Sequence, residues 1–426
     1  MNSNMKNSGI EWVGNIPSNW DCKPIRSLFH ENRNKNIRGT ETKALQFKFG
    51  TIVPKENFEA ENDEYVAKTI HNYNIVDKGT IMLNGLNLNF DFVTKRVAIV
   101  QERGVITSAY IAFEVNDENE VLPEYANYLL KCYDSCAAFH NMGGGVRKIL
   151  NFAELKRCLF LVPPHSIQEQ IVAFLNIKCQ QMDELSDEIV KQIEVLDNYR
   201  RSLITEIVTR GLCQDITKKD SGIEYIGEIP AHWNIHPLYV YFGERKNKNR
   251  LGRESNLLSL SYGKLVRKDI NTNEGLLPES FNTYNIIEAG DIIIRPTDLQ
   301  NDKRSLRTGL ATEHGIITSA YIDLMPIKQI STAYFHYLLH AFDVMKVFYN
   351  MGNGVRQGLN FSEFSRLMVF EPPIDEQNAI VNFLDSKCSE IDQVIADKKE
   401  QLEKIEEYKK SLIYEYVTGK KEVPVA

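Results

Sequence analysis

An internal repeat that runs along the whole chain is the feature that most constrains its fold. Residues 8–36 return as residues 221–249 at a constant offset of 213, with fourteen of the twenty-nine positions identical. Five later segments return in the same order, and over them the offset falls only to 209. Because few insertions separate the copies, the 426 residues are expected to form two related modules rather than one core.

The similarity between the two copies is uneven. Residues 37–75 and 84–104 scarcely match residues 250–285 and 295–315, whereas the opening segment, a Gly-x-Gly loop and a long helical segment match closely. A constant frame around a divergent interior is expected of two modules that share a fold but have different targets.

Periodicity predicts an α+β fold in each module. Short apolar runs bounded by Gly and Asn, such as TIML, YIAFEV and DIIIR, are typical of strands. Residues 122–139 and 330–348 predict helices of three to five turns. After each Pro-Pro pair, a helical pattern without Gly or Pro runs from about Ile171 to Val208 and from Ile380 to Val417. Each of these helices would be roughly 55–60 Å long.

Apolar residues recur at an average spacing of 3.5 in both long helices, which predicts a coiled-coil pair. The predicted seam residues are Met182, Ile189, Ile193, Leu196 and Leu203 in the first helix, and Ile391, Ile395, Leu402, Ile405 and Leu412 in the second. The alternative is that each helix lies on a globular core. A pseudo-twofold relation between the halves would make the pair antiparallel, with the modules at opposite ends. The expected segments are modules at 1–164 and 213–373, and helical segments at 165–212 and 374–426, the last with a C-terminal tail.

Composition limits the compartment and the possible partners. The start of the chain has no apolar leader and no stretch is long enough to span a membrane, so a cytoplasmic protein without membrane contact is expected. Seven scattered cysteines without CxxC pairs predict no disulfide framework. The net charge of −7 does not exclude a nucleic-acid partner, because the acidic residues concentrate in the helical stretches and DNA affinity needs only a local basic surface.

The order module, helix, module, helix resembles the specificity (S) subunits of type I restriction–modification systems along essentially the whole chain. The resemblance rests on SGIEWVGNIPSNW and its copy, on GxGVR, on PPHSIQEQIVAFL and PPIDEQNAIVNFL, and on YRRSLI and YKKSLI. The order of these motifs, found twice, is specific, whereas each motif alone is short. The first copy, PPHSIQEQ, departs from PPIDEQ in the spacing of its Glu-Gln pair, which we interpret as variation at the start of the helix.

The resemblance implies a DNA-recognition role without catalysis. Each module would be a target recognition domain for one half of a split, asymmetric sequence of double-stranded DNA. The coiled coil would set the gap between the half-sites and dock two modification (M) subunits. No cofactor is then expected on this chain, because S-adenosylmethionine would be bound by those adenine methyltransferase subunits, and ATP and Mg by restriction (R) subunits.

Basic and amide side chains give the candidate DNA contacts. The run that ends the opening segment offers Arg33, Lys35, Asn36 and Arg38, and its copy offers Lys246, Lys248, Arg250 and Arg253, as candidates for phosphate contact. The divergent segments offer Asn84, Asn87, Lys95 and Arg96, and in the second module Arg295, Asn301, Lys303, Arg304 and Arg307, as candidates for base readout. Each charged run is equally well explained as a solvated loop.

The Gly-x-Gly loops are a third candidate, because glycines let the backbone approach a phosphate closely. Their residues are Gly143, Gly145, Arg147 and Lys148 in the first module, and Gly352, Gly354, Arg356 and Gln357 in the second. The alternative is a tight turn before the short helices predicted at NFAEL and NFSEF.

No motif in the sequence predicts an active site. Neither a phosphate-binding G-x-x-x-x-G-K-[ST] string nor the N-P-P-[YF] string of adenine methyltransferases is present. His336 and His340 lie four residues apart but lack an obvious third ligand, so no metal site is expected. The remaining alternatives are an enzyme (a fused restriction enzyme fragment or a methyltransferase with an unfamiliar motif), a coiled-coil scaffold that binds only proteins, and an S subunit that serves a methyltransferase without an R subunit.

Overall fold

The structural units do not coincide with the two halves of the sequence. In the computed structural model, unit 1 comprises Met1–Ile189 and Glu400–Ala426, and unit 2 comprises Val190–Lys399. The structure describes residues 4–55, 70–91, 93, 95–142, 148–213, 215–223, 226–270, 280–297, 299, 306–349, 351 and 358–424. Each unit contains one module, the start of the long helix that follows this module, and the end of the other long helix.

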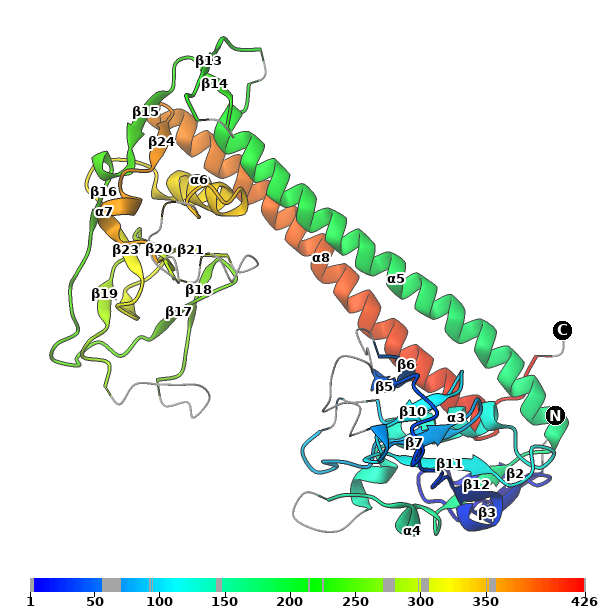
Figure 1. The fold of residues 1–426 in the computed structure, drawn as a ribbon. Helices are drawn as coiled ribbons and strands as arrows, with labels where there is room; N and C mark the ends of the chain where they lie inside the picture. The colour runs from blue at the N-terminus through cyan, green and yellow to red at the C-terminus, as the bar shows by residue number, and fades with distance from the viewer. Residues whose placement is uncertain are drawn as a thin grey trace. The chain divides into compact units, whose positions relative to one another are not determined.

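Unit 1 is built on a four-stranded antiparallel sheet of order β4-β11-β8-β9 (Figure 1). Within the described residues, unit 1 also contains four two-stranded antiparallel pairs: β1-β2, β3-β12, β5-β6 and β7-β10. The strands are β1 (Met5–Asn7), β2 (Asn15–Pro17), β3 (Asp21–Pro24), β4 (Phe29–Glu31), β5 (Leu45–Lys48), β6 (Thr51–Pro54), β7 (Asn74–Val76), β8 (Ile81–Leu83), β9 (Val97–Ile99), β10 (Gly104–Ile106), β11 (Ile111–Val115) and β12 (Leu159–Val162). The helices of the module are α1 (Ile25–Leu28), α3 (Pro123–Ser135), the 3-10 helix η1 (Ala138–Asn141) and α4 (Phe152–Leu155).

Unit 2 repeats this plan with a sheet of order β16-β23-β20-β21. Its two-stranded pairs are β13-β14, β15-β24, β17-β18 and β19-β22. The strands are β13 (Lys218–Asp220), β14 (Glu228–Pro230), β15 (Asn234–Pro237), β16 (Phe242–Glu244), β17 (Leu258–Ser261), β18 (Lys264–Arg267), β19 (Asn285–Ile287), β20 (Ile292–Ile294), β21 (Thr308–Leu310), β22 (Gly315–Ile317), β23 (Ile322–Pro326) and β24 (Met368–Glu371). The helices are the 3-10 helix η2 (Leu238–Val240), α6 (Thr332–Val344) and α7 (Phe361–Phe364). The predicted α+β duplication is confirmed.

The helices α3 and α6 are shorter than their patterns predict. The predictions extended to residues 139 and 348, but the helices end at Ser135 and Val344. Soon after each end, Ala137 has a φ of 54° and Lys346 a φ of 62°. Because the left-handed conformation cannot continue a right-handed helix, it ends both helices at equivalent positions.

The long helices α5 (His165–Arg210) and α8 (Ile374–Val417) begin directly after the Pro-Pro pairs, about six residues earlier than the apolar pattern predicts. A buried glutamine secures each start. Gln168 donates to the carbonyls of Glu120 and Pro163 and accepts from the N–H of Leu122. Gln377 makes two of the matching bonds in unit 2, donating to the carbonyl of Pro372 and accepting from the N–H of Ser331. The two prolines therefore precede a glutamine at the same distance in both copies, which removes the apparent difference in motif spacing.

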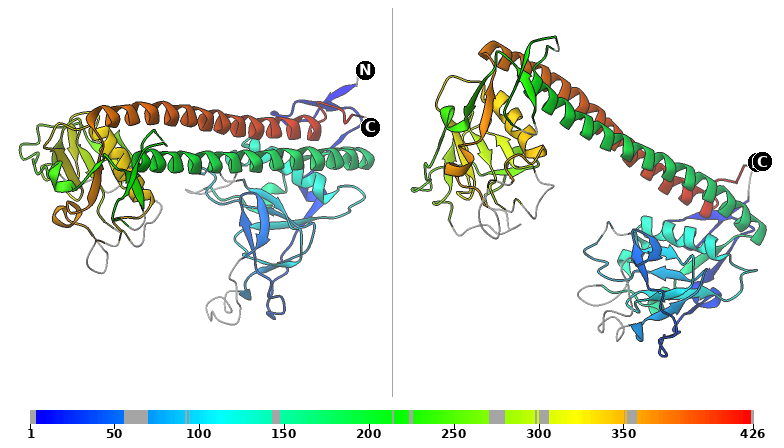
Figure 2. Two further views of the ribbon diagram at one scale, coloured as in Figure 1. Left: turned by 90° about the horizontal axis from the view of Figure 1, so that it is seen from above. Right: turned by 45° about the horizontal axis from the view of Figure 1, so that its top comes forward.

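The two long helices run antiparallel in each unit. In unit 1 the ring centroids of Phe174, near the start of α5, and Tyr416, near the end of α8, lie 4.5 Å apart. The end of α8, drawn in red, lies alongside the start of α5 (Figures 1 and 2). In unit 2, Lys398 donates to Gln192, and Arg200 pairs with Asp392. Of the predicted seam residues, Ile189, Ile391, Ile395 and Leu412 are buried, and Met182, Ile193, Leu196, Leu203, Leu402 and Ile405 are half-buried.

The last turns of each long helix also complete the core of a module. In unit 1, Leu412, Tyr416 and Val417 of α8 pack into the core that contains Trp20 and Phe160. In unit 2, Ile204 and Val208 of α5 take the same role. Tyr125 of α3 donates to the carbonyl of Val417 at 3.2 Å, and Tyr334 of α6 donates to that of Val208 at 3.3 Å. Neither module core is therefore complete within its own half of the sequence.

Among the helices that the structure describes, none has the length and apolar character needed to cross a membrane.

Candidate nucleic-acid interface

The basic run after β4 forms a loop whose shape depends on one buried amide. Asn36, only 1% exposed, donates to the carbonyl of Glu41 at 2.8 Å and accepts from its N–H at 3.2 Å. Arg33, Lys35 and Arg38 around it are exposed. Arg33 pairs with Glu31, and the Lys35 ammonium donates to the carbonyl of Asn72. Asn36 therefore shapes the loop, and the prediction that it contacts DNA is wrong in this conformation.

Unit 2 holds its basic loop in the same way. Asn249 is 2% exposed and makes the two matching bonds to the backbone of Glu254, at 2.8 and 3.2 Å. Lys246, Arg250 and Arg253 are exposed, and Lys248 is half-buried, with its ammonium donating to the carbonyl of Thr283 at 3.0 Å. Both modules thus share the backbone hydrogen bonds that shape the basic loop, and both expose cationic side chains on it.

Two arginines in the divergent segments are structural. Arg96 is 0% exposed, and its guanidinium donates to the carbonyls of Asn84, Leu86 and Asp91. Arg307 is also 0% exposed, and donates to the carbonyls of Arg295 and Thr297. The backbone N–H groups of the two arginines bond to equivalent carboxylates, on Asp134 and Asp343.

This placement corrects the prediction that Arg96 and Arg307 read bases. A side chain without exposed surface cannot enter a DNA groove, and here the guanidinium instead supplies donors to backbone carbonyls. The sequence contained a signal for this role: arginine stands at the same position of both copies within segments that otherwise diverge.

The other candidate DNA contacts differ in how far their side chains are exposed. Asn87 and Lys95 are exposed, Asn87 with a φ of 53°, whereas Asn84 and Arg295 are half-buried. Lys148 is half-buried, and its ammonium lies 3.5 Å from the carbonyl of His140. The predicted contacts at Asn301, Lys303, Arg304, Gly143, Gly145, Arg147, Gly352, Gly354, Arg356 and Gln357 lie outside the described residues. The short helices after the Gly-x-Gly loops, α4 and α7, both begin with a capping box, at Asn151 and Asn360.

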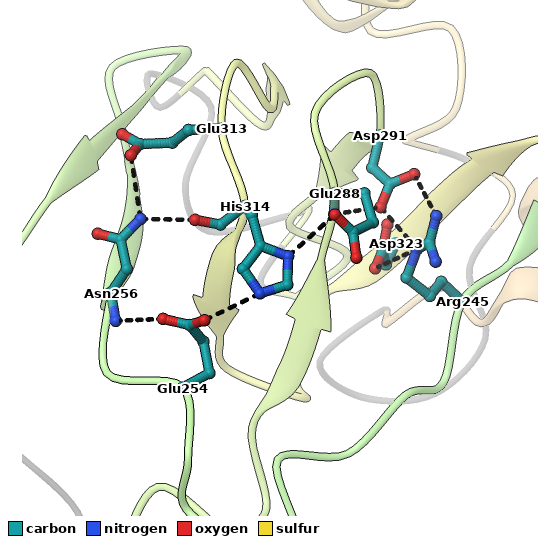
Figure 3. Close-up of polar contacts among 8 residues, drawn as sticks. All are labelled: Arg245, Glu254, Asn256, Glu288, Asp291, Glu313, His314 and Asp323. Carbon is teal, nitrogen blue, oxygen red and sulfur yellow. Dashed lines mark hydrogen bonds and ion pairs between the residues drawn. The ribbon is translucent and has the colours of Figure 1, made fainter.

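A bridging side chain ties each basic loop to the rest of its module. In unit 2, His314 lies between two carboxylates, with Nε2 2.9 Å from Glu254 and Nδ1 2.9 Å from Glu288 (Figure 3). The hydrogen bond to Glu288 raises the pKa of His314, and burial opposes this rise only in part. Glu254 is the residue whose backbone Asn249 holds, so the bridge fixes the far end of the basic loop.

In unit 1 an arginine takes the place of His314. Arg103 donates to Glu41 at 3.1 Å and to Asp77 at 2.6 Å, and these acids stand at the positions of Glu254 and Glu288. The two modules thus share the geometry of the bridge but differ in its response to pH, because arginine does not titrate near neutrality.

A buried acidic pair lies beside this bridge in unit 2. Asp291 and Asp323 are each 1% exposed, and Arg245 donates to Asp291 at 2.7 and 3.1 Å (Figure 3). Burial and the neighbouring Asp291 carboxylate raise the pKa of Asp323. The residues at the three corresponding positions of unit 1 are Asn32, Thr80 and Ala112, so the interiors of the modules differ in charge as well as in sequence.

An exposed aromatic residue at a hairpin tip recurs in both units and was missed in the sequence. Phe49, between β5 and β6, is 83% exposed with a φ of 48°. Tyr262, between β17 and β18, is 89% exposed with a φ of 46°. A glycine follows each, and the offset of 213 between these aromatic-Gly pairs was the available signal.

Comparison with known proteins identifies the module. The family model of the type I restriction modification DNA specificity domain matches residues 17–195. Over these residues the chain is similar to a type I restriction modification DNA specificity domain. This family supplies DNA-recognition subunits and is non-catalytic in general. The resemblance to type I specificity subunits stated from the motifs is therefore confirmed.

The similarity to specificity subunits extends along nearly the whole chain. A protein of Methanocaldococcus jannaschii assigned as the MjaX specificity subunit of a type I restriction enzyme is 23% identical over 430 residues, covering 96% of this chain and 95% of that protein. The MjaVIII specificity subunit of the same organism is 24% identical, covering 81% and 80%. A solved chain from work on assembly and conformational transition of the type I R-M system is 13% identical with a TM-score of 0.66, covering 94% and 98%, and shares the fold.

Proposed function

We propose that this chain is the DNA-recognition subunit of a type I restriction–modification complex, and that each module reads one half of a bipartite, asymmetric target in double-stranded DNA. The repeated basic loop carries this proposal. Asn36 and Asn249 hold the same loop shape in both modules, the cations around it are exposed, and the neighbouring segments differ between the modules. A shared frame with different surroundings suits two related readers of different sequences.

The exposed cations of the loops are suited to phosphate contact. Arg33, Lys35 and Arg38, and Lys246, Arg250 and Arg253 in the other module, would set affinity and register rather than sequence preference. Base readout is left to the segments that diverge, where Asn87 is exposed on a left-handed turn and an amide can pair with adenine.

In this proposal the paired long helices are the spacer that sets the gap between half-sites, and they dock two modification subunits. Apolar side chains exposed on the helices support protein docking: Leu185 is 48% and Tyr408 60% exposed, and both line a groove of about 310 Å³ with Met182 and Phe174. The modification subunits would bring S-adenosylmethionine and methylate adenine, and restriction subunits would bring ATP and Mg. The chain itself would hold no cofactor or catalytic metal and would work on DNA in the cytoplasm.

Co-expression with the adenine methyltransferase encoded beside this chain tests the proposal. We expect a stable complex and N6-methyladenine that depends on both proteins. The double variant Arg250→Gln/Arg253→Gln should lower methylation with the complex intact, whereas Lys6→Gln/Lys218→Gln, which removes two exposed charges outside the loops, should not. Methylation by the purified chain with S-adenosylmethionine alone would instead favour an enzyme, and a chain that affects no methylation would favour a scaffold.

A further inference from the structure

Unit 1 contains a cavity of about 520 Å³ that is lined by four lysines. Lys95 lies between β8 and β9, Lys131 belongs to α3, and Lys409 and Lys410 belong to the YKKSLI motif of α8. Phe49 and Gly50, at the tip of the β5–β6 hairpin, line the same cavity. A volume of this size accommodates a nucleotide-sized ligand.

Two of the four lysines are neutralised by carboxylates that also line the cavity. Lys95 pairs with Glu406 at 2.9 Å, and Lys409 pairs with Asp183. For Lys131 and Lys410, the described part of the chain offers no carboxylate at ion-pair distance. Desolvation, with Lys409 and Lys95 close by, lowers the pKa of Lys131. Asp134 also lines the cavity, so four lysines face three carboxylates, and an anion would compensate the remaining positive charge.

The tip of the β5–β6 hairpin, which lines the cavity, has two consecutive residues with positive φ angles. Phe49 has a φ of 48° and its ring remains 83% exposed, although burial would be favourable for an aromatic side chain. Gly50 has a φ of 76°, and a Cβ added there would lie 2.8 Å from the Cβ of Lys95. A glycine at this position therefore lets the tip lie against Lys95.

We infer that this cavity binds one nucleotide of a DNA strand, with the phosphate between Lys131 and Lys410 and the Phe49 ring packed against the neighbouring sugar or base. The combination of ammonium groups with an exposed ring matches the way proteins hold a nucleic-acid strand. The hairpin tip of unit 2 repeats the exposed ring at Tyr262. The inference rests on the proposed DNA-recognition function and adds a contact site outside the basic loops.

Salt-dependent DNA binding by the complex of the full chain and its methyltransferase tests this inference. The probe is a fluorescein-labelled duplex that carries the target sequence, measured by anisotropy. Lys131→Gln and Lys410→Gln should each weaken binding, and the double variant should reduce the slope of log K against log salt by about 0.9, because it frees the one phosphate that the two lysines share. Phe49→Gly, which fits a positive φ, should weaken binding roughly tenfold. Lys78→Gln, which removes an exposed charge outside the cavity, should change neither quantity.

The possible outcomes separate the inference from the function on which it rests. If the unaltered complex does not bind the duplex, the proposed DNA-recognition function fails. If it binds, and the Lys131 and Lys410 variants keep its slope and affinity, the inferred site is wrong while the function stands. Adenosine monophosphate provides the other arm: protection of the unaltered chain against thermal unfolding that is lost in Lys131→Gln, with DNA binding unchanged, would assign the cavity to a free nucleotide and overturn the inference.

Discussion

Replacing Arg96 by methionine should destabilise unit 1 without removing a DNA contact. The guanidinium is fully buried and donates to three backbone carbonyls, at 3.1 Å to Asn84, 2.7 Å to Leu86 and 2.5 Å to Asp91. Methionine fills a similar length of space but leaves the carbonyls of Asn84 and Leu86 without donors, whereas the Asp91 carbonyl keeps the His140 ring as a partner.

The magnitude follows from the groups left unpaired. An acceptor left without a partner costs about 1–3 kcal/mol, which for two carbonyls amounts to roughly 2–6 kcal/mol. Removing a buried charge recovers part of its desolvation cost. We therefore expect the free energy of unfolding of unit 1 to fall by about 2–4 kcal/mol, which would speed exchange through global opening about 30- to 1,000-fold.

Native-state hydrogen exchange measured by mass spectrometry can resolve this effect within unit 1. The amides of β8 and β9, which flank the arginine-held segment, should exchange faster in the Arg96→Met variant. Arg33→Met is the matched control because its side chain is 80% exposed, so exchange should stay near the unaltered rate. Unchanged exchange in Arg96→Met, together with weakened DNA binding, would refute the structural role and restore a direct contact.

Three further predictions concern other local devices. The bridge of His314 stabilises unit 2 in full below the unfolded pKa of about 6.5, and this stabilisation is lost as the pH rises through the raised folded pKa. The variant His314→Arg copies Arg103 and does not titrate in this range. It should therefore reduce the fall in the melting temperature of unit 2 between pH 6 and pH 8. An equal loss in both proteins would contradict this. Gln168→Leu should lower the free energy of unfolding by roughly 2–3 kcal/mol in urea, because the N–H of Leu122 loses the buried acceptor of Gln168. An unchanged midpoint would show that water replaces the amide. Asn151→Ala should cost about 1 kcal/mol and speed exchange in α4, and no change there would mean that the capping box is dispensable.

The main architecture could be predicted because it depends on patterns that survive duplication. Apolar periodicity located the strands at TIML and YIAFEV and the long helices, and the repeat itself fixed their number. The start of each long helix was placed too late because the first turns carry few seam residues. Their stability comes instead from tertiary bonds made by Gln168 and Gln377, which an apolar pattern does not register.

The candidate interface was harder to predict, because composition does not distinguish an exposed cation from a buried one. Arg96 and Arg307 appeared equivalent to Arg33 in the sequence, and only the fold reveals that they donate to carbonyls inside the module. The lysine cavity combines residues from α3 and the far end of α8, which are almost three hundred positions apart. No local pattern could have joined them.

The most direct test of the central claim is a module exchange followed by mapping of N6-methyladenine in host DNA by long-read sequencing. Residues 8–160 would be replaced by the corresponding module of another specificity subunit, with the chain co-expressed with its methyltransferase. We expect one bipartite motif for the unaltered chain, and a motif in which one half alone has changed for the exchanged chain. Methylation that does not depend on the chain, or a motif whose two halves both change or both persist, would contradict the assignment of one half-site to each module.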